Sequence, residues 1–413
     1  MASEGSLSSA FVSAQHVNPI PNQILASLES LRQKLVQEND SASARPRPNK
    51  GNAITLHQMD RYDVLRRLET VIDHIVTSLS KFEAPRIAYN SRTTWQNIRF
   101  TESVGLQMIP NANASEVRFD STNSVKKFGM TLQVIAMCYK LVQGNTFSTK
   151  RDMYYYDTKL FGSQSVLDDI IDNISCMIQV PRESLHILAA SKGWVAGDLH
   201  YKEGESNLVD CSVTKTGIAI PANINTISDI TSSAKMVLIV EKDAIFQKLL
   251  DEKLFEKIPE CIMVTGRGFP DVSTRRMVKK LWDCLQIPIL ALVDADPHGM
   301  AILSVYKYGS RGLSFDTEQL AVPMIRWLGV LPSDIERFHI RQDSLIPLST
   351  ADLNKAREIM QRPFYTAQPM WMKEMQVMLS TNCKAEIEAL TSISRSFLTD
   401  VYIPSKIADQ GWI

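Results

Sequence analysis

Hydrophobic residues recur at two different spacings along this chain, and the change between them predicts two kinds of domain. Between residues 60 and 178 many apolar positions fall three or four apart, which is the spacing of an apolar stripe on a helix. From residue 235 they gather into short continuous runs, each followed by a stretch with helical spacing. Buried strands that alternate with helices are typical of a parallel α/β sheet. We therefore predict a mixed α/β protein, with a helical domain first and a parallel α/β domain second.

The N-terminal segment shows no sustained apolar period. Its first fifty residues contain nine serines and four prolines. Such a segment buries too little surface to offset the entropy of ordering it, so we predict a largely disordered tail over residues 1–55. Within this tail, the spacing over residues 24–36 would suit a short helix.

A segment over residues 56–90 is interpreted as a separate amphipathic helix, whose apolar stripe runs over residues 60–82. Pro85 ends this helix, because the residue before a proline disfavours helical dihedral angles. The stripe, which includes Leu68 and Ile75, has two interpretations: it packs on its own domain, or it binds a partner protein.

Residues 95–225 are predicted to form a winged helix-turn-helix domain. Three helices are expected, over residues 126–142, 151–160 and 166–178. Two strand-like segments follow, over residues 185–190 and 218–222. Seven Lys or Arg and three Asp or Glu lie between residues 118 and 159, an excess of positive charge that attracts a phosphate backbone.

Residues 230–413 are predicted to form the α/β domain, with buried strands over residues 236–240, 261–264 and 287–293. In an open parallel sheet, ligand-binding groups collect at the carboxyl ends of the strands. Glu241 follows the first strand, and Asp294 and Asp296 follow the third, so we expect the three carboxylates to converge. Such carboxylates repel unless a cation separates them, and oxygen ligands favour Mg²⁺. The pattern therefore predicts a magnesium site and a nucleotide or nucleic acid as substrate.

The turn after the second strand, T-G-R-G-F-P-D, lacks the third glycine of a dinucleotide-binding fingerprint. Its glycines allow close backbone approach to a ligand. In that arrangement Arg267 would meet a phosphate and Phe269 a base.

Three consecutive tyrosines, Tyr154, Tyr155 and Tyr156, follow Arg151 in the second predicted helix. Successive helix positions differ by about 100°, so the three rings cannot all face one core. At least one is expected to be exposed beside Arg151. A phenol is a weak nucleophile at neutral pH, but it becomes effective where cations stabilise its oxyanion and a metal polarises the phosphate.

Composition excludes several classes of protein. The 413 residues include 45 Lys plus Arg and 45 Asp plus Glu, so the formal charge is zero and a wholly basic protein is excluded. The apolar runs are far shorter than the roughly 20 residues that cross a bilayer, so no membrane association is expected. The six cysteines are scattered without a C-x-x-C pair, which suits a reducing intracellular compartment and predicts no zinc site.

Four motifs occur in one order: R-D-x-Y-Y, V-E-K-D-A, T-G-x-G-x-P-D and V-D-A-D-P-H-G. As a set they resemble the A subunit of topoisomerase VI and, more closely, its eukaryotic relatives, the transesterases that make meiotic DNA double-strand breaks. The resemblance covers residues 64–413. It implies a winged-helix domain followed by a Toprim domain, which is the parallel α/β domain that binds magnesium in this family.

The resemblance also implies a role for each matching residue. Tyr155 resembles the nucleophile that becomes joined to a 5′ DNA end, and Arg151 the arginine that steadies the scissile phosphate. The magnesium ligands that it implies are Glu241, Asp294 and Asp296. Lys192 and Phe269 match positions that contact DNA. The sequence departs from the family pattern at Tyr156, a third tyrosine, which leaves the identity of the nucleophile open by one position.

The resemblance further implies the setting of the reaction. The enzyme would be a topoisomerase VI-like (type IIB) transesterase of the isomerase class, acting on double-stranded DNA in the nucleus, on meiotic chromosomes. A homodimer is implied, with a separate B-type subunit docked on the helix 60–82. Two alternatives are a non-catalytic DNA-binding scaffold of the same fold and a magnesium-dependent phosphotransferase that uses the D-x-D step. Covalent attachment to DNA distinguishes the transesterase from both.

Overall fold

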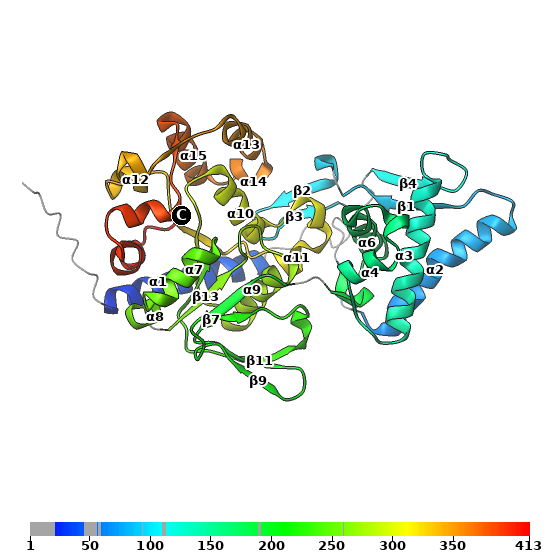
Figure 1. The fold of residues 1–413 in the computed structure, drawn as a ribbon, viewed down its shortest axis with the longest axis horizontal. Coiled ribbons are helices and arrows are strands. Elements are labelled where there is room, and N and C mark those ends of the chain that lie inside the picture. The colour runs from blue at the N-terminus through cyan, green and yellow to red at the C-terminus, as the bar shows by residue number, and fades with distance from the viewer. Residues whose placement is uncertain are drawn as a thin grey trace, which may run out of the picture.

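The computed structural model describes residues 21–44, 56, 59–92, 94–109, 113–188, 191–258 and 260–413. They form a helical body and an α/β body that lie next to each other along the long axis of the molecule (Figure 1). The mixed α/β architecture expected from the sequence is thereby confirmed. None of the described helices combines the length and apolar composition that a membrane crossing requires.

The α/β body is built on a six-stranded sheet in the order β10-β7-β13-β12-β14-β15. Its parallel strands are β12 (Met236–Val240), β13 (Cys261–Thr265), β14 (Ile289–Leu292) and β15 (Arg326–Gly329). The first three are the predicted apolar runs, and all their residues are buried. The helices that follow them are α7 (Asp243–Asp251), α9 (Val272–Leu285) and α10 (Pro297–Tyr308). The predicted parallel α/β sheet is therefore confirmed.

Two antiparallel strands complete this sheet on the β13 side: β7 (Trp194–Gly197) and β10 (Ile218–Ala219). Both lie inside the predicted winged-helix domain 95–225, and the segment 218–222 was expected to form part of its wing. That boundary is wrong, because these strands pair with the α/β sheet. A further sheet projects below it in Figure 1 and consists of β8 (His200–Glu203), β9 (Asn207–Asp210) and β11 (Ile227–Thr231).

A hairpin from the start of the same predicted domain also packs on the α/β body. Its strands are β2 (Ile98–Thr101) and β3 (Gly105–Met108), and Leu106 lies in the α/β core. Gly105 has a φ of +103°, and a Cβ there would lie 2.5 Å from the carbonyl oxygen of Tyr308. Only glycine fits this close approach of two backbones.

The helical body contains the three predicted helices, α3 (Val125–Gln143), α4 (Lys150–Tyr156) and α6 (Gln164–Ile178). The second is shorter than predicted, because the Asp157 side chain accepts a hydrogen bond from Leu160 N and starts a separate helix, α5 (Thr158–Phe161). From the predicted strand-like segment 185–190, Ile187–Leu188 forms the strand β6 in the helical body, parallel to β5 (Ser148–Thr149). An antiparallel pair, β1 (Arg86–Asn90) and β4 (Ala114–Arg118), packs beside α6.

The predicted amphipathic helix is α2 (Arg61–Ser80), and Asp60 caps it by accepting a hydrogen bond from Asp63 N at 2.9 Å. Val64 and Leu68 are buried in the same core as α3 and α6. Ile75 is buried against β1 and α3. For this face, the interpretation that the stripe packs on its own domain is confirmed.

The prediction of a disordered tail is wrong for residues 21–44, because they form the helix α1 (Pro21–Ala44). Its residues Leu28 and Leu35 are buried in the α/β core. Ser27 Oγ donates a hydrogen bond to the carbonyl oxygen of Ala408 at 3.0 Å, and Glu38 pairs with Arg326 at 2.6 Å. The apolar spacing over residues 24–36 was therefore the informative signal. The rest of the predicted tail, 1–20 and 45–55, lies outside the described residues.

The segment after β15 folds back onto the sheet. Its helices are α12 (Asp334–Arg337), α13 (Thr350–Met360), α14 (Pro363–Thr366), α15 (Pro369–Thr381) and α16 (Ile403–Ala408). The short strands β16 (Ile346–Pro347) and β17 (Cys383–Lys384) pair within it, and α8 (Leu254–Lys257) precedes β13. The short helix α11 (Thr317–Leu320) lies just before β15. Trp327 N donates to the carbonyl oxygen of Ile413 at 2.7 Å, so the end of the described chain lies along the outer sheet edge.

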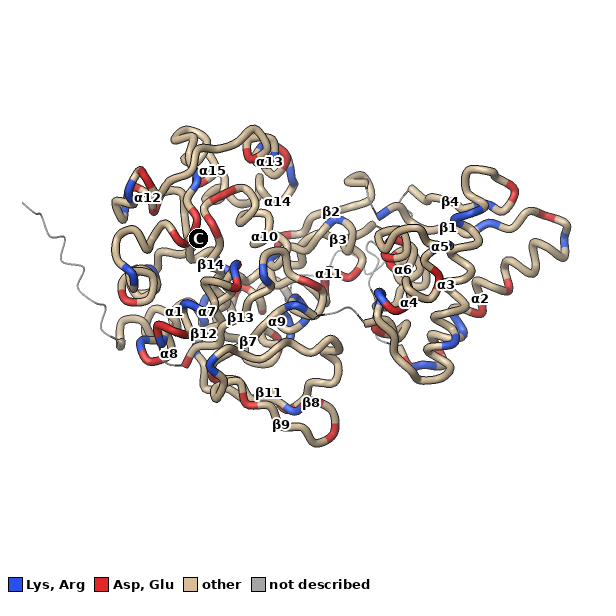
Figure 2. The backbone as a smooth tube through the Cα atoms, viewed as in Figure 1, with Lys and Arg blue, Asp and Glu red and all other residues tan. Residues whose placement is uncertain are grey.

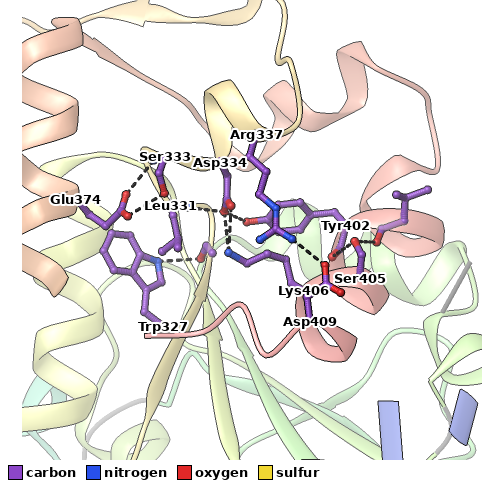
Figure 3. Close-up of polar contacts among 12 residues, drawn as sticks. Trp327, Leu331, Ser333, Asp334, Arg337, Glu374, Tyr402, Ser405, Lys406 and Asp409 are labelled. Carbon is purple, nitrogen blue, oxygen red and sulfur yellow. Dashed lines mark hydrogen bonds and ion pairs between the residues drawn. The ribbon is translucent and has the colours of Figure 1, made fainter. Parts of the chain in front are cut away.

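A buried charged cluster holds this C-terminal segment in place (Figure 3). Lys406 Nζ lies 3.0 and 3.1 Å from the two carboxylate oxygens of Asp334, and Tyr402 donates its hydroxyl to the same carboxylate at 2.5 Å. Lys406 and Asp334 are each 1% exposed. Burial lowers the pKa of Lys406, and Asp334 opposes that shift by favouring the ammonium form.

Removing one member of this buried pair should be strongly destabilising. Lys406→Met leaves Asp334 charged and unpaired in the core, so we expect the free energy of unfolding to fall by about 3 kcal/mol or more. Lys406→Met combined with Asp334→Asn should recover part of that loss, because no buried charge remains. Denaturant unfolding of the single and double variants measures this. Equal stability of wild type and Lys406→Met would contradict the prediction.

Candidate active site

The start of α4 is defined by a capping box. Thr149 Oγ1 accepts a hydrogen bond from Asp152 N at 3.1 Å, and Asp152 Oδ2 accepts one from Thr149 N at 3.3 Å. These bonds satisfy backbone donors that the first helical turn leaves free. Arg151 therefore lies in the first turn, one turn before the tyrosines, and its side chain is exposed.

The three tyrosines on α4 differ in their surroundings. Tyr154 is half-buried and donates its hydroxyl to the carbonyl oxygen of Gly162 at 3.3 Å. Tyr155 and Tyr156 are 64% and 70% exposed. The expected exposure of a tyrosine beside Arg151 is confirmed, and Tyr154 is the one whose hydroxyl is engaged within the fold.

The acidic residues come together at the carboxyl edge of the α/β sheet. Glu241 follows β12 and Asp294 follows the neighbouring β14. The backbone N–H of Asp294 donates to Glu241 Oε2 at 2.9 Å. Both side chains are buried, with residue exposures of 8% and 5%.

The environment of this pair disfavours its negative charges. Burial raises the pKa of Glu241, and the nearby Asp294 carboxylate raises it further. Burial also raises the pKa of Asp294, although hydrogen bonds from Ile387 N and Lys242 Nζ act in the opposite direction. A divalent cation between the two carboxylates would relieve both effects.

Asp296 is the N-cap residue of α10. Its side chain accepts a hydrogen bond from Gly299 N at 2.6 Å and caps the N-terminus of α10. Glu241 and Asp294 therefore meet through the backbone N–H of Asp294 and, besides burial, the Asp296 carboxylate is close enough to raise the pKa of both. Within the described part of the chain, no group of three His, Cys, Asp or Glu side chains is arranged to hold a metal ion.

A lysine supplies the positive charge beside the acidic pair. Lys242 Nζ lies 3.0 Å from Asp294 Oδ2, 3.1 Å from Glu386 Oε2 and 2.8 Å from Glu388 Oε2. Burial lowers the pKa of Lys242, but hydrogen bonds to Glu388 and Asp294 outweigh burial and raise the pKa overall. Sequence spacing did not single out these glutamates, because they lie more than 140 residues from Lys242 along the chain.

The turn after β13 packs against the same edge. Gly268 N donates to the carbonyl oxygen of Glu241 at 2.8 Å. Lys192 joins this turn through its backbone N–H, which donates to Asp271 at 2.7 Å, and through Nζ, which donates to the carbonyl oxygen of Arg267 at 3.3 Å. Phe269 is 46% exposed. The two predicted DNA-contacting side chains, Lys192 and Phe269, therefore lie on one surface next to Glu241.

A cavity of about 600 Å³ lies between the two bodies. Its lining includes Arg151 from the helical body and Phe269 from the α/β body. The excess of positive charge predicted for residues 118–159 is partly neutralised here, because Lys150 lies 3.7 Å from Asp168 and 3.6 Å from Asp172 of α6. In Figure 2, Lys and Arg and Asp and Glu are scattered over both bodies.

The candidate nucleophile and the acidic pair belong to different bodies. Tyr155 lies on α4 of the helical body, and Glu241 and Asp294 follow β12 and β14 of the α/β body. Figure 2 labels these three elements. Among the described residues, no hydrogen bond or ion pair joins Tyr155 to either acid. The candidate nucleophile and the acidic pair therefore lie on separate parts of the chain.

Known protein families match parts of both bodies. A family model for the Toprim domain of Spo11 and of the topoisomerase 6 A-type chain matches residues 236–407, and one described as "Type IIB DNA topoisomerase" matches residues 126–187. The chain is 50% identical over 351 residues to "Meiotic recombination protein SPO11" of Homo sapiens, covering 85% of this chain and 89% of that protein. It is 37% identical over 354 residues to the A-type chain of DNA topoisomerase 6 of Arabidopsis thaliana, covering 85% and 81%.

Proposed function

Because the chain belongs to the Spo11/topoisomerase 6A family of topoisomerase VI-like, DNA-cleaving enzymes, we propose that it makes the DNA double-strand breaks that initiate meiotic recombination. Its place of action would then be the nucleus, on meiotic chromosomes. The observation that carries the proposal is the presence of two features in one chain. An exposed tyrosine lies next to Arg151 on a capped helix, and a buried acidic pair lies at the sheet edge.

The proposed reaction is a transesterification at Tyr155. Its phenolic oxygen forms a bond to the scissile phosphorus and loses its proton, while the bond from phosphorus to the 3′ oxygen breaks and that oxygen gains a proton. The DNA is left with a free 3′ hydroxyl and a 5′ phosphotyrosyl ester, so the bond energy is conserved. Arg151, one helical turn earlier, would stabilise the negative charge of the phosphate in this step.

The donor set at the sheet edge suits Mg²⁺. Toprim domains generally bind a divalent cation, and Glu241 and Asp294 present carboxylate oxygens, which are the ligands that Mg²⁺ prefers. Burial raises the pKa of both carboxyl groups, and a bound cation would favour their charged forms. We propose these two residues as ligands, with Asp296 contributing less because its carboxylate also caps α10. When bound, the ion would polarise the phosphate that Tyr155 attacks.

The separation of the two half-sites supports a twofold homodimer. In this arrangement Tyr155 of one protomer meets Glu241 and Asp294 of the other, and the symmetry produces two complete sites, one for each DNA strand. Lys192 and Phe269, beside the acidic pair, would contact the DNA there.

We further propose that α2 binds a B-type subunit, through a different face from the one first expected. Leu68 is fully buried in the helical body, so it belongs to that body's core. The apolar side chains that remain exposed at the C-terminal end of α2 include Val76 at 56% and Leu79 at 53%. An exposed apolar stripe on a helix is the feature that a groove in a partner recognises.

This assignment predicts opposite results for two substitutions. Val76→Glu combined with Leu79→Glu should weaken association with a B-type subunit by at least about tenfold and change the melting temperature little, because both side chains are exposed. Leu68→Glu should lower the melting temperature strongly, because it buries an unpaired charge. Thermal unfolding and titration calorimetry with the B-type subunit measure the two effects. Unchanged affinity in the double variant would contradict the assignment of this face.

The direct test of the proposed function is recovery of DNA covalently bound to the protein. The full chain, its B-type subunit, Mg²⁺ and duplex DNA are incubated and then denatured, and a phosphotyrosyl peptide is sought by mass spectrometry. Linkage through Tyr155 supports the proposal. DNA binding without linkage would favour the scaffold alternative, and phosphate transfer without linkage would favour the phosphotransferase.

A further inference from the structure

The ammonium group of Lys242 lies at the proposed metal site. Both carboxylate oxygens of Asp294 are engaged: Oδ1 accepts a hydrogen bond from Ile387 N at 2.9 Å, and Oδ2 lies 3.0 Å from Lys242 Nζ. Oε2 of Glu241 accepts a hydrogen bond from Asp294 N. A divalent ion that binds Asp294 through Oδ2 must therefore displace the ammonium group of Lys242.

We propose that Lys242 is a built-in competitor for the divalent cation: it neutralises Asp294 when no ion is bound and transfers to Glu386 and Glu388 when an ion binds. This inference rests on the proposed function, because it takes Glu241 and Asp294 as the ligands of the ion. Lys242 acts here as a positioning residue that sets how readily the site fills.

Glu386 and Glu388 provide the second location for the ammonium group of Lys242. Glu386 and Glu388 contact Lys242 at 3.1 and 2.8 Å, and their side chains are 47% and 43% exposed, so they lie toward solvent from Asp294. Ile387, between them, is hydrogen-bonded to Asp294. The segment is thus anchored to the acidic pair, and Lys242 exchanges one carboxylate partner for two that it already touches.

The positive charge of Lys242 determines whether its removal tightens or weakens binding of the divalent cation. An ammonium group and a divalent cation that share one carboxylate repel each other, and at a separation of about 4 Å this repulsion is large even with partial screening. Removing the lysine charge should therefore tighten binding of the ion. A residue that instead organised the site for the ion would have the opposite effect when removed.

The first experiment measures Mn²⁺ binding to the purified full chain by calorimetry and by electron paramagnetic resonance, without DNA or turnover. Lys242→Met keeps the length of the side chain and removes its charge, and we expect it to lower the dissociation constant for Mn²⁺ about tenfold. Lys248→Met is the matched control in α7, the helix that Lys242 precedes. Lys248 pairs with Glu252 rather than Asp294, so this change should leave the constant unchanged.

The outcomes separate this inference from the proposed function. If wild type binds Mn²⁺ and Lys242→Met binds it equally or more weakly, the competitor role is wrong and the metal site stands. If neither protein binds Mn²⁺, the metal site fails and this inference fails with it, whereas covalent attachment through Tyr155 remains a separate measurement.

A double-mutant cycle tests the transfer to the glutamates. Glu386→Gln combined with Glu388→Gln removes the second location, so Lys242 stays on Asp294 and Mn²⁺ binding should weaken several-fold. In the Lys242→Met background the same two changes should have a much smaller effect, because no lysine remains to be transferred. An equal loss in both backgrounds would show that the glutamates act on the ion directly, and would overturn the transfer step.

Chemical labelling needs no substitution and keeps the inference testable if a variant fails to fold. An amine-reactive reagent is applied to the wild-type chain with and without Mn²⁺, and labelling is measured by mass spectrometry. Release from Asp294 should raise the labelling of Lys242 several-fold relative to Lys248. Equal labelling of Lys242 in a preparation shown to bind Mn²⁺ would contradict the displacement.

Discussion

Tyr155→Phe is expected to abolish covalent attachment to DNA and to reduce cleavage by more than about a thousandfold, because it removes the attacking oxygen. The change keeps the ring. Tyr155 is 64% exposed and no hydrogen bond engages its hydroxyl within the described part of the chain, so the free energy of unfolding should change by less than about 0.5 kcal/mol. Denatured protein recovered from the cleavage reaction, probed for linked DNA, measures the effect.

Tyr156→Phe and Tyr154→Phe are the matched controls on the same helix. Tyr156 is equally exposed, at 70%, and its variant should retain covalent complexes. Tyr154→Phe loses the hydrogen bond to Gly162 and should retain linkage with a modest loss of stability, about 1 kcal/mol. Linkage that persists in Tyr155→Phe and disappears in Tyr156→Phe would move the nucleophile by one residue. Persistence in all three variants would contradict the transesterase mechanism.

Glu241→Gln and Asp294→Asn should each reduce cleavage by roughly a hundredfold or more, because each removes a charged ligand from the proposed cation site. Both substitutions keep the shape of the side chain. Glu241→Gln also relieves repulsion in a buried pair, so the metal-free protein should be at least as stable as wild type in denaturant unfolding. The measurement is the yield of DNA breaks as Mg²⁺ is titrated, beside the unfolding curve.

Asp296→Asn is the control for this pair. Asparagine can still accept the hydrogen bond from Gly299 N and cap α10, and a magnesium site tolerates a water molecule in place of one protein ligand. Cleavage should therefore fall much less than in Asp294→Asn. Equal break formation by wild type and Asp294→Asn would contradict the proposed metal site.

Strongly patterned local elements could be predicted from the sequence alone. The strands β12, β13 and β14 were predicted because buried parallel strands appear as short apolar runs, and α2, α3 and α6 because each carries an apolar stripe of helical spacing. The rule that ligand groups collect at the carboxyl ends of parallel strands placed Glu241 and Asp294 on one edge. Their backbone hydrogen bond agrees with that expectation.

The predicted domain boundaries differ from the structure where segments contact partners that are far away in the sequence. The short segments β7 and β10 have too few residues for a clear period, and their partners in the α/β sheet decide where they belong. The polar composition of α1 predicts a disordered tail, yet Leu28, Leu31 and Leu35 are buried and the helix packs against α16 of the C-terminal segment. Composition describes the average environment of a segment, whereas burial depends on which surface lies opposite.

The sequence by itself determined the order of the two domains, the identity of the acidic edge and the exposed tyrosine beside Arg151, because each follows from local periodicity or from adjacent residues. Only the tertiary structure decided that Asp296 caps α10, that Leu68 belongs to the core of the helical body and that Lys242 is surrounded by Asp294, Glu386 and Glu388. The physical reason is that a side chain's charge partners and its burial are set by groups that lie near it in space, and the chain brings these together from segments that no local spacing connects.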